Sequence, residues 1–245
     1  MSELTIISAT GAALPVTPFE GRHLINGQWC ASHDGATFER ASPAHGTCVS
    51  RSARGGATEA CAAITAARQA FDSGTWSRLA GKARAAVLLT VATLIEANVE
   101  RIALLETLES GKPISQARGE IAGSADLWRY AAALARTLHG DSHNSLGSDM
   151  LGLVLKEPIG VVSIITPWNF PAAMITRKAA PALAAGCSML VKPAEQTPLT
   201  AYALEVLALR AGLPQDVLLH VSGDAVEVGQ VVCERETVKK LSFTG

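Results

Sequence analysis

From Gly160 onward, short apolar runs alternate with helix-like runs, and every connection between them is short. Strands are expected over 161–165, 188–191, 217–221 and from 240, and helices over 172–185, 199–211 and 225–234. This alternation is typical of a parallel sheet with helices on both faces. The fold class expected is therefore α/β, a doubly wound parallel sheet. Ligands of such sheets bind at the carboxyl ends of the strands, so the loops that follow the strands are the candidate site.

The half of the chain before Gly160 is predicted to be largely helical, after short strands and turns over 23–54. Helices are expected over 59–71, as one unbroken element from about 82 to 110, and over 114–138. Thr58 is a favoured N-cap residue for the first of them. The long second helix is predicted from apolar residues that recur at three- and four-residue steps.

Residues 139–158 differ from both halves. The stretch is rich in turn residues and then alternates like a strand, which predicts an edge hairpin that leaves the main body. The expected organisation is a nucleotide-binding domain built from residues 1–138 and 159–245, with residues 139–158 as a hairpin excursion that serves oligomerisation.

Composition argues against several classes of function. Lys and Arg number 21 against 22 Asp and Glu, for a net charge of −1, so no electrostatic case exists for a nucleic-acid partner. The apolar runs are too short and too interrupted to span a bilayer, and "MSELTIISATGAALP" has no signal-peptide pattern. The five cysteines lack metal-ligand spacing, which favours free thiols, no bound metal and a cytoplasmic location.

The loop "TPWNFP" follows the first strand of the alternating half and contains no glycine. Pro167 and Pro171 stiffen it, and Pro171 suits the first turn of a helix. Asn169 then offers a fixed, neutral amide donor, which suits an oxygen that becomes negative only in a transition state. An N-cap role is the alternative, and spacing alone favours the cap.

The loop "VKPAEQTP" follows the next strand. The Lys192 ammonium can reach a phosphate or a ribose hydroxyl. Glu195 stands where dinucleotide folds place an acidic residue for the adenosine ribose. Its carboxylate would accept both ribose hydroxyls and repel a 2′-phosphate, which favours NAD over NADP. A solvated surface ion pair is the alternative.

Three longer motifs, "GVVSIITPWNFP", "PALAAGCSMLVKPAEQTP" and "KLSFTG", together closely resemble the aldehyde dehydrogenase superfamily. "LINGQW" and "LESGKP" extend the resemblance towards the N-terminus, so that it covers the chain from about His23. The resemblance implies that Asn169 donates to an oxyanion hole. It also implies NAD contacts for a set of residues at the strand ends, namely Thr166, Trp168, Lys192, Glu195 and Gly245.

The resemblance implies a covalent mechanism, in which a cysteine thiolate attacks an aldehyde and hydride passes to the nicotinamide. A glutamate-activated water then releases the acid. None of the five cysteines matches the nucleophile motif. The nucleophile, the glutamate base and most of the catalytic domain are therefore expected to be missing, and the 245 residues alone are expected not to oxidise an aldehyde. A truncated fragment with residual nucleotide binding, and a reductase or acyl-forming relative, remain alternatives.

The stretch "FPAAMITRKAAPALAAGC" resembles the succinate-semialdehyde dehydrogenase branch. The resemblance places Arg177 in the substrate tunnel, where a guanidinium would pair with the substrate's carboxylate. A salt-bridged helix arginine is an equally weighted alternative, and the stretch over 139–158 looks more like other branches. The family further implies a homo-oligomer.

Overall fold

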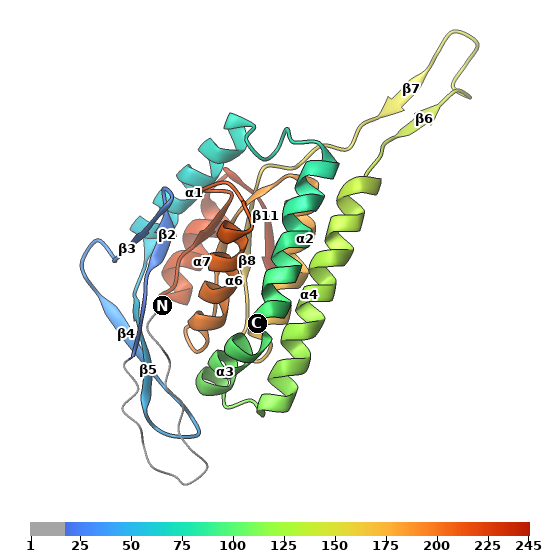
Figure 1. Ribbon diagram of the computed structural model, residues 1–245. Coiled ribbons are helices and arrows are strands. Elements are labelled where there is room, and N and C mark those ends of the chain that lie inside the picture. Colours follow the sequence, from blue (N-terminus) through green and yellow to red (C-terminus); the bar gives the residue numbers. More distant parts are fainter. Residues whose placement is uncertain (1–17) are drawn as a thin grey trace.

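A six-stranded sheet forms the centre of the structure, a computed structural model that describes residues 18–245 (Figure 1). The strand order is β11 (Val238–Phe243), β8 (Val161–Ile165), β9 (Ser188–Lys192), β10 (Leu218–His220), β2 (His23–Ile25) and β3 (Gln28–Cys30). The strands from β11 to β10 are parallel, as predicted. The β2–β3 hairpin extends the sheet by antiparallel pairing, which the sequence did not predict.

Alternate residues of the central strands face two different helix layers. Val162 and Ile164 belong to one core cluster with α5 (Pro171–Ala185) and α6 (Pro198–Arg210). Val161 and Leu190 belong to a second cluster with α1 (Ala57–Ser73) and α7 (Ala225–Glu234). Helices therefore cover both faces of the sheet, and the predicted doubly wound α/β fold is confirmed.

A second helical layer lies outside α5 and α6. It consists of α2 (Gly81–Ala97), α3 (Val99–Ser110) and α4 (Ile114–Thr137). The predicted single helix from 82 to 110 is wrong, because the chain breaks at Asn98, whose side-chain amide donates to the Leu94 carbonyl at 2.7 Å. The predicted cap Thr58 is also wrong, since α1 begins after Gly56, and the Glu59 carboxylate accepts from the Gly56 N–H at 2.9 Å.

A two-stranded hairpin, β6 (Asp141–His143) and β7 (Gly152–Val154), projects away from the main body (Figure 1). The hairpin falls within residues 139–158, for which the sequence predicts an excursion. Apolar side chains of this segment are exposed, namely Leu146, Met150, Leu151, Leu153, Val154 and Leu155. The role of the hairpin in oligomerisation remains a prediction.

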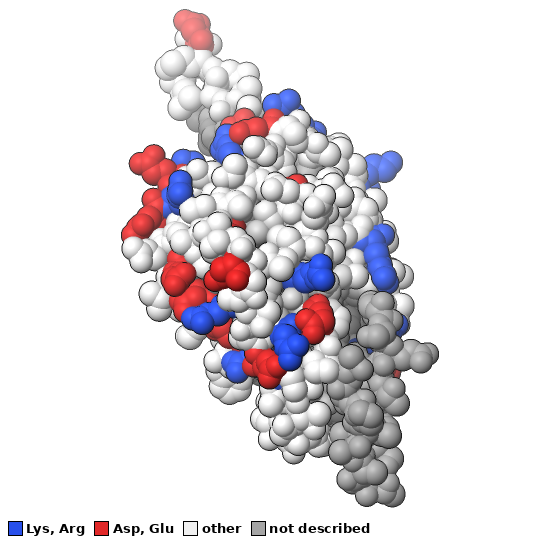
Figure 2. All heavy atoms as spheres, turned by 90° about the vertical axis from the view of Figure 1, so that its left-hand side faces the viewer, with Lys and Arg blue, Asp and Glu red and all other residues white. Residues whose placement is uncertain are grey.

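A small sheet of β1 (Phe19–Gly21), β5 (Cys48–Ala53) and β4 (Thr37–Ala41) lies beside the main sheet. On the face where β3, β4 and β5 lie, Lys and Arg side chains are interspersed with Asp and Glu (Figure 2). Arg51, for example, pairs with Glu39 at 2.6 Å. Within residues 18–245, no helix is both long and apolar enough to cross a membrane. The stretch interpreted as lacking a signal peptide, residues 1–15, lies outside the described residues.

Candidate functional site

The loops after β8 and β9 leave the sheet side by side. Ile165 pairs with Lys192 at the ends of these two parallel strands. On the other side of β8, Phe243 pairs with Ile165, and the Thr244 N–H donates to the Ile165 carbonyl at 3.2 Å. The topology therefore brings the predicted residues to one edge of the sheet, namely Thr166, Trp168, Asn169, Lys192, Glu195 and Gly245.

The loop after β8 exposes its central side chains. Asn169 is exposed, Trp168 is 52% exposed and Phe170 is 48% exposed. Phe170, not Asn169, is the N-cap residue of α5, and Pro171 is the first helical residue. Among the contacts of residues 18–245, the Asn169 amide makes no hydrogen bond to the helix end. The N-cap interpretation of Asn169 is therefore wrong in this structure, and the amide is available to a ligand.

Thr166 anchors the start of the same loop. Its backbone N–H donates to the Lys192 carbonyl at 3.2 Å, which ties the two loops together. Its hydroxyl is buried, and it has no hydrogen-bond partner within the described part of the chain. A buried polar atom without a partner costs free energy, and ligand binding at this edge could offset that cost.

Lys192 and Glu195 form an ion pair of 2.7 Å between Nζ and Oε1. The Lys192 side chain is only 2% exposed, so the pair is not the solvated surface pair that was the alternative interpretation. The Arg40 guanidinium donates to the backbone carbonyl of Glu195 and fixes the loop from the small sheet. Glu195 lines an open hollow of about 200 Å³ together with Arg54 and Asp224. A half-buried carboxylate in such a hollow can accept hydrogen bonds from two neighbouring hydroxyls.

The loop after β10 is occupied by structural contacts. Gly223 has a φ of 135°, and a Cβ there would lie 2.2 Å from the Gly55 carbonyl oxygen. Asp224 caps α7 and accepts from the N–H groups of Val226 and Glu227 at 2.9 and 3.0 Å. These contacts explain the loop without a ligand.

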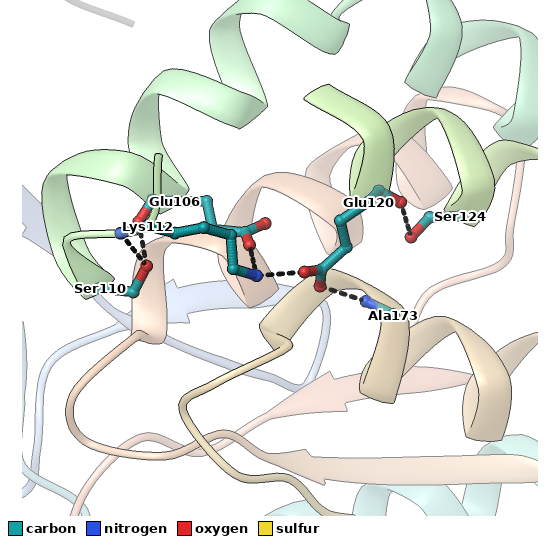
Figure 3. Close-up of polar contacts among 6 residues, drawn as sticks. All are labelled: Glu106, Ser110, Lys112, Glu120, Ser124 and Ala173. Atoms are coloured by element: carbon teal, nitrogen blue, oxygen red, sulfur yellow. Dashed lines mark hydrogen bonds and ion pairs between the residues drawn. The ribbon is translucent and has the colours of Figure 1, made fainter. Parts of the chain in front are cut away.

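Buried glutamates of α3 and α4 hold the starts of α5 and α6, and sequence reasoning missed them. The Glu109 carboxylate accepts from the N–H groups of Leu199 and Thr200 at 2.7 and 3.2 Å. Burial raises the pKa of Glu109 to about 8, although both hydrogen bonds act to lower it. Glu120 accepts from Ala173 in α5 at 2.9 Å (Figure 3). The motif "LESGKP", which contains Glu109, was noted only as a resemblance.

Arg177 lies on the second turn of α5 and is exposed. No ion pair of Arg177 is found within residues 18–245, so the alternative of a salt-bridged helix arginine is not observed. The neighbouring Lys178 donates to the Ser242 hydroxyl at 3.1 Å, and burial lowers the pKa of its ammonium. The two cations therefore have different environments, since Lys178 is partly buried against Ser242 and Arg177 is exposed.

Comparisons with known proteins decide the family. The model of the aldehyde dehydrogenase family matches residues 29–245. The chain belongs to the aldehyde dehydrogenase family. The family resemblance of the sequence motifs is thereby confirmed, as is its extent over nearly all of the chain.

Similar family members include semialdehyde dehydrogenases. The chain is 44% identical over 93% of its length to the NADP(+) succinate-semialdehyde dehydrogenase GabD of Escherichia coli, of which it covers 47%. It is 45% identical over 93% of its length to glutarate-semialdehyde dehydrogenase of Pseudomonas putida, with 47% of that protein covered. The structure of an NAD-dependent aldehyde dehydrogenase from Sinorhizobium meliloti matches with a TM-score of 0.91 and 44% identity, covering 94% of this chain and 46% of that one. The chain thus spans about half the length of the relatives it matches.

Proposed function

We propose that this chain carries the nucleotide-binding edge of an NAD-dependent aldehyde dehydrogenase, and that the aldehyde is a semialdehyde with an anionic terminus. The observation that carries the proposal is the Lys192–Glu195 pair at the end of β9, directly beside the exposed Asn169 loop at the end of β8. This arrangement would bring a carboxylate that can accept from a ribose and an amide that can donate to a reacting oxygen to the same edge of the sheet.

The nucleotide would be held by polar groups that this edge already offers. Glu195 would accept from the two hydroxyls of the adenosine ribose, and Lys192 would stay close through its ion pair. The buried, unpartnered hydroxyl of Thr166 supports a polar ligand here. A 2′-phosphate would bring two negative charges next to the Glu195 carboxylate, which is the reason for proposing NAD rather than NADP.

Asn169 would act on the aldehyde oxygen. Its amide donates hydrogen bonds without carrying a charge, so it stabilises an oxygen most strongly when that oxygen becomes negative. When bound, the nicotinamide supplies the acceptor for the hydride that leaves the substrate. Trp168, in the loop after β8, and Gly245, two residues after the end of the neighbouring β11, would line the groove for that ring.

Arg177 would recognise the far end of the substrate. The names of three relatives specify aldehydes with an anionic end, namely succinate semialdehyde, glutarate semialdehyde and 3-sulfolactaldehyde. A guanidinium binds carboxylate or sulfonate oxygens through parallel N–H donors. Its exposure and the lack of an observed ion pair support this role for Arg177.

Calorimetry and kinetics test the two parts of the proposal in the protein that carries this chain. NAD should bind more tightly than NADP, and Glu195→Gln should reduce that preference, while Glu234→Gln at the far end of α7 should not. In assays with succinate semialdehyde, Arg177→Met should raise KM, but it should leave KM for an uncharged aldehyde unchanged. Arg210→Met, at the last residue of α6, is the matched control. Equal binding of both nucleotides with no effect of Glu195→Gln would contradict the cofactor assignment.

A further inference from the structure

The N-terminus of α5 has no cap of its own. The N-cap residue is Phe170, whose side chain has no hydrogen-bonding atom, so the first-turn N–H groups need another acceptor. Glu120 supplies it from α4, because its Oε1 accepts from the Ala173 N–H at 2.9 Å across 53 residues of sequence. The helix end that directly follows Asn169 is therefore held by a different helix.

The second oxygen of Glu120 is held by Lys112. The Lys112 ammonium contacts the carboxylates of both Glu106 and Glu120 (Figure 3). The side chains of Lys112, Glu106 and Glu120 are 10%, 0% and 4% exposed, so water screens these contacts little. Burial raises the pKa of Glu106 to about 8, and the Lys112 ammonium opposes that shift.

Lys112 also contacts the loop itself. Its Nζ lies 4.5 Å from the centroid of the Phe170 ring, within the range of a cation–π interaction. The same ammonium thus touches the residue that follows Asn169 and the carboxylate that caps the helix after it. The segment on the C-terminal side of Asn169 is therefore contacted at two points by one ion network, at the Ala173 N–H and at the Phe170 ring.

We propose that Glu120 and Lys112 are positioning residues for the Asn169 amide, which they orient by holding Ala173 and Phe170. The effect on catalysis rests on the proposed function. The mechanical link, by which Glu120 and Lys112 hold the segment after Asn169, does not. An oxyanion donor must point at its target within narrow limits, and a misplacement of about 1 Å can cost roughly 10²-fold in rate.

Four variants separate the parts of the network. Glu120→Ala removes the acceptor for Ala173 and the partner of Lys112. Glu120→Gln and Lys112→Met keep an acceptor for Ala173 but remove the ion pair. Glu100→Ala is the matched control, because Glu100 forms an exposed pair with Arg118 at 2.8 Å, also between α3 and α4.

Hydrogen exchange read by mass spectrometry measures the mechanical link. In Glu120→Ala, exchange over residues 168–174 should rise roughly tenfold, which corresponds to the loss of one cap. Glu120→Gln and Lys112→Met should give smaller increases in the same segment, and Glu100→Ala none. Unchanged exchange in Glu120→Ala, or an increase spread over the whole chain, would overturn the proposal.

Kinetics measure the catalytic consequence. Glu120→Ala should lower kcat roughly 10- to 10²-fold while the Kd for NAD stays within twofold of wild type, because the Lys192–Glu195 loop is held separately by Glu109. Glu120→Gln should recover part of kcat. Equal losses in kcat and NAD affinity would overturn the positioning role. If the unsubstituted protein that carries this chain oxidises no aldehyde, the proposed function fails. The exchange experiment alone then decides whether Glu120 and Lys112 hold the Asn169 loop.

Discussion

The loop before α7 and the loops before α5 and α6 lie at the same edge of the sheet, but their helix ends are satisfied in different ways. Asp224 caps α7 from the adjacent position. The starts of α5 and α6 are capped by Glu120 and Glu109, which are 53 and 90 residues distant in sequence. Thr197, the N-cap residue of α6, leaves its hydroxyl without a partner within the described residues.

This difference divides the loops at this edge into one that caps its own helix and two whose helices are capped by side chains of other helices. A self-capped helix uses its own loop side chain, as Asp224 does when it accepts from the N–H groups of Val226 and Glu227. A helix capped from elsewhere frees its loop, and the two freed loops are the ones that carry Asn169 and the Lys192–Glu195 pair. We infer that the α3–α4 pair takes over the capping and thereby leaves these loops for ligand binding.

The largest expected effect concerns the freed side chain of the α5 loop. Asn169→Ala should reduce kcat by roughly 10²–10³, as for the removal of other oxyanion donors, while unfolding free energy changes little, since the amide caps nothing. Steady-state kinetics and urea denaturation check both parts. A large loss of stability in Asn169→Ala would mean that the loop is structural.

Removal of the remote cap of α6 should have the next largest effect. Glu109→Ala leaves the buried N–H groups of Leu199 and Thr200 without an acceptor, at about 1–3 kcal/mol for each. Thr197→Val is the matched local control and should cost less than about 0.5 kcal/mol, because its hydroxyl caps nothing. Denaturant unfolding of both variants measures the difference. The reverse ranking would contradict remote capping.

The same cap predicts a pH dependence. Burial raises the pKa of Glu109 from 4.5 to about 8, so the folded chain binds a proton that the unfolded chain releases within this window. The contribution to stability is complete below pH 4.5 and is lost as pH rises to about 8, by up to about 1.4 kcal/mol per pH unit. The unfolding free energy of wild type minus that of Glu109→Gln should therefore fall from pH 5 to 8. A constant difference would show that the carboxylate is already ionised.

The smallest effect is expected at the self-capped helix. Asp224→Ala removes one N-cap side chain and should lower the unfolding free energy by about 1 kcal/mol, with kcat unchanged. Hydrogen bonds from the N–H groups of Glu227 and Val226 lower the pKa of this carboxyl. The stability that Asp224→Ala loses should therefore be smaller in acid, because protonation of Asp224 removes the cap from the wild type as well. A change in kcat would contradict a purely capping role for Asp224.

The two kinds of capping also explain what the sequence could predict. The helix over 225–234 was predicted correctly because the strand–helix alternation that indicates it is local in the chain. The parallel order of β8 and β9 followed from short connections, and it brought Asn169 and Glu195 to one edge. The partnership of Glu120 with Ala173 could not be predicted, since it depends on how α4 packs on α5. The break at Asn98 was missed because the apolar period continues across it.

The most direct test of the account is a crystal structure of the protein with NAD bound. The adenosine ribose should lie at the carboxyl end of β9, with its hydroxyl oxygens about 2.5–3.0 Å from the Glu195 carboxylate, and the nicotinamide should lie near Asn169. A nucleotide on another face, or at this edge with the ribose turned away from Glu195, would contradict the central claim.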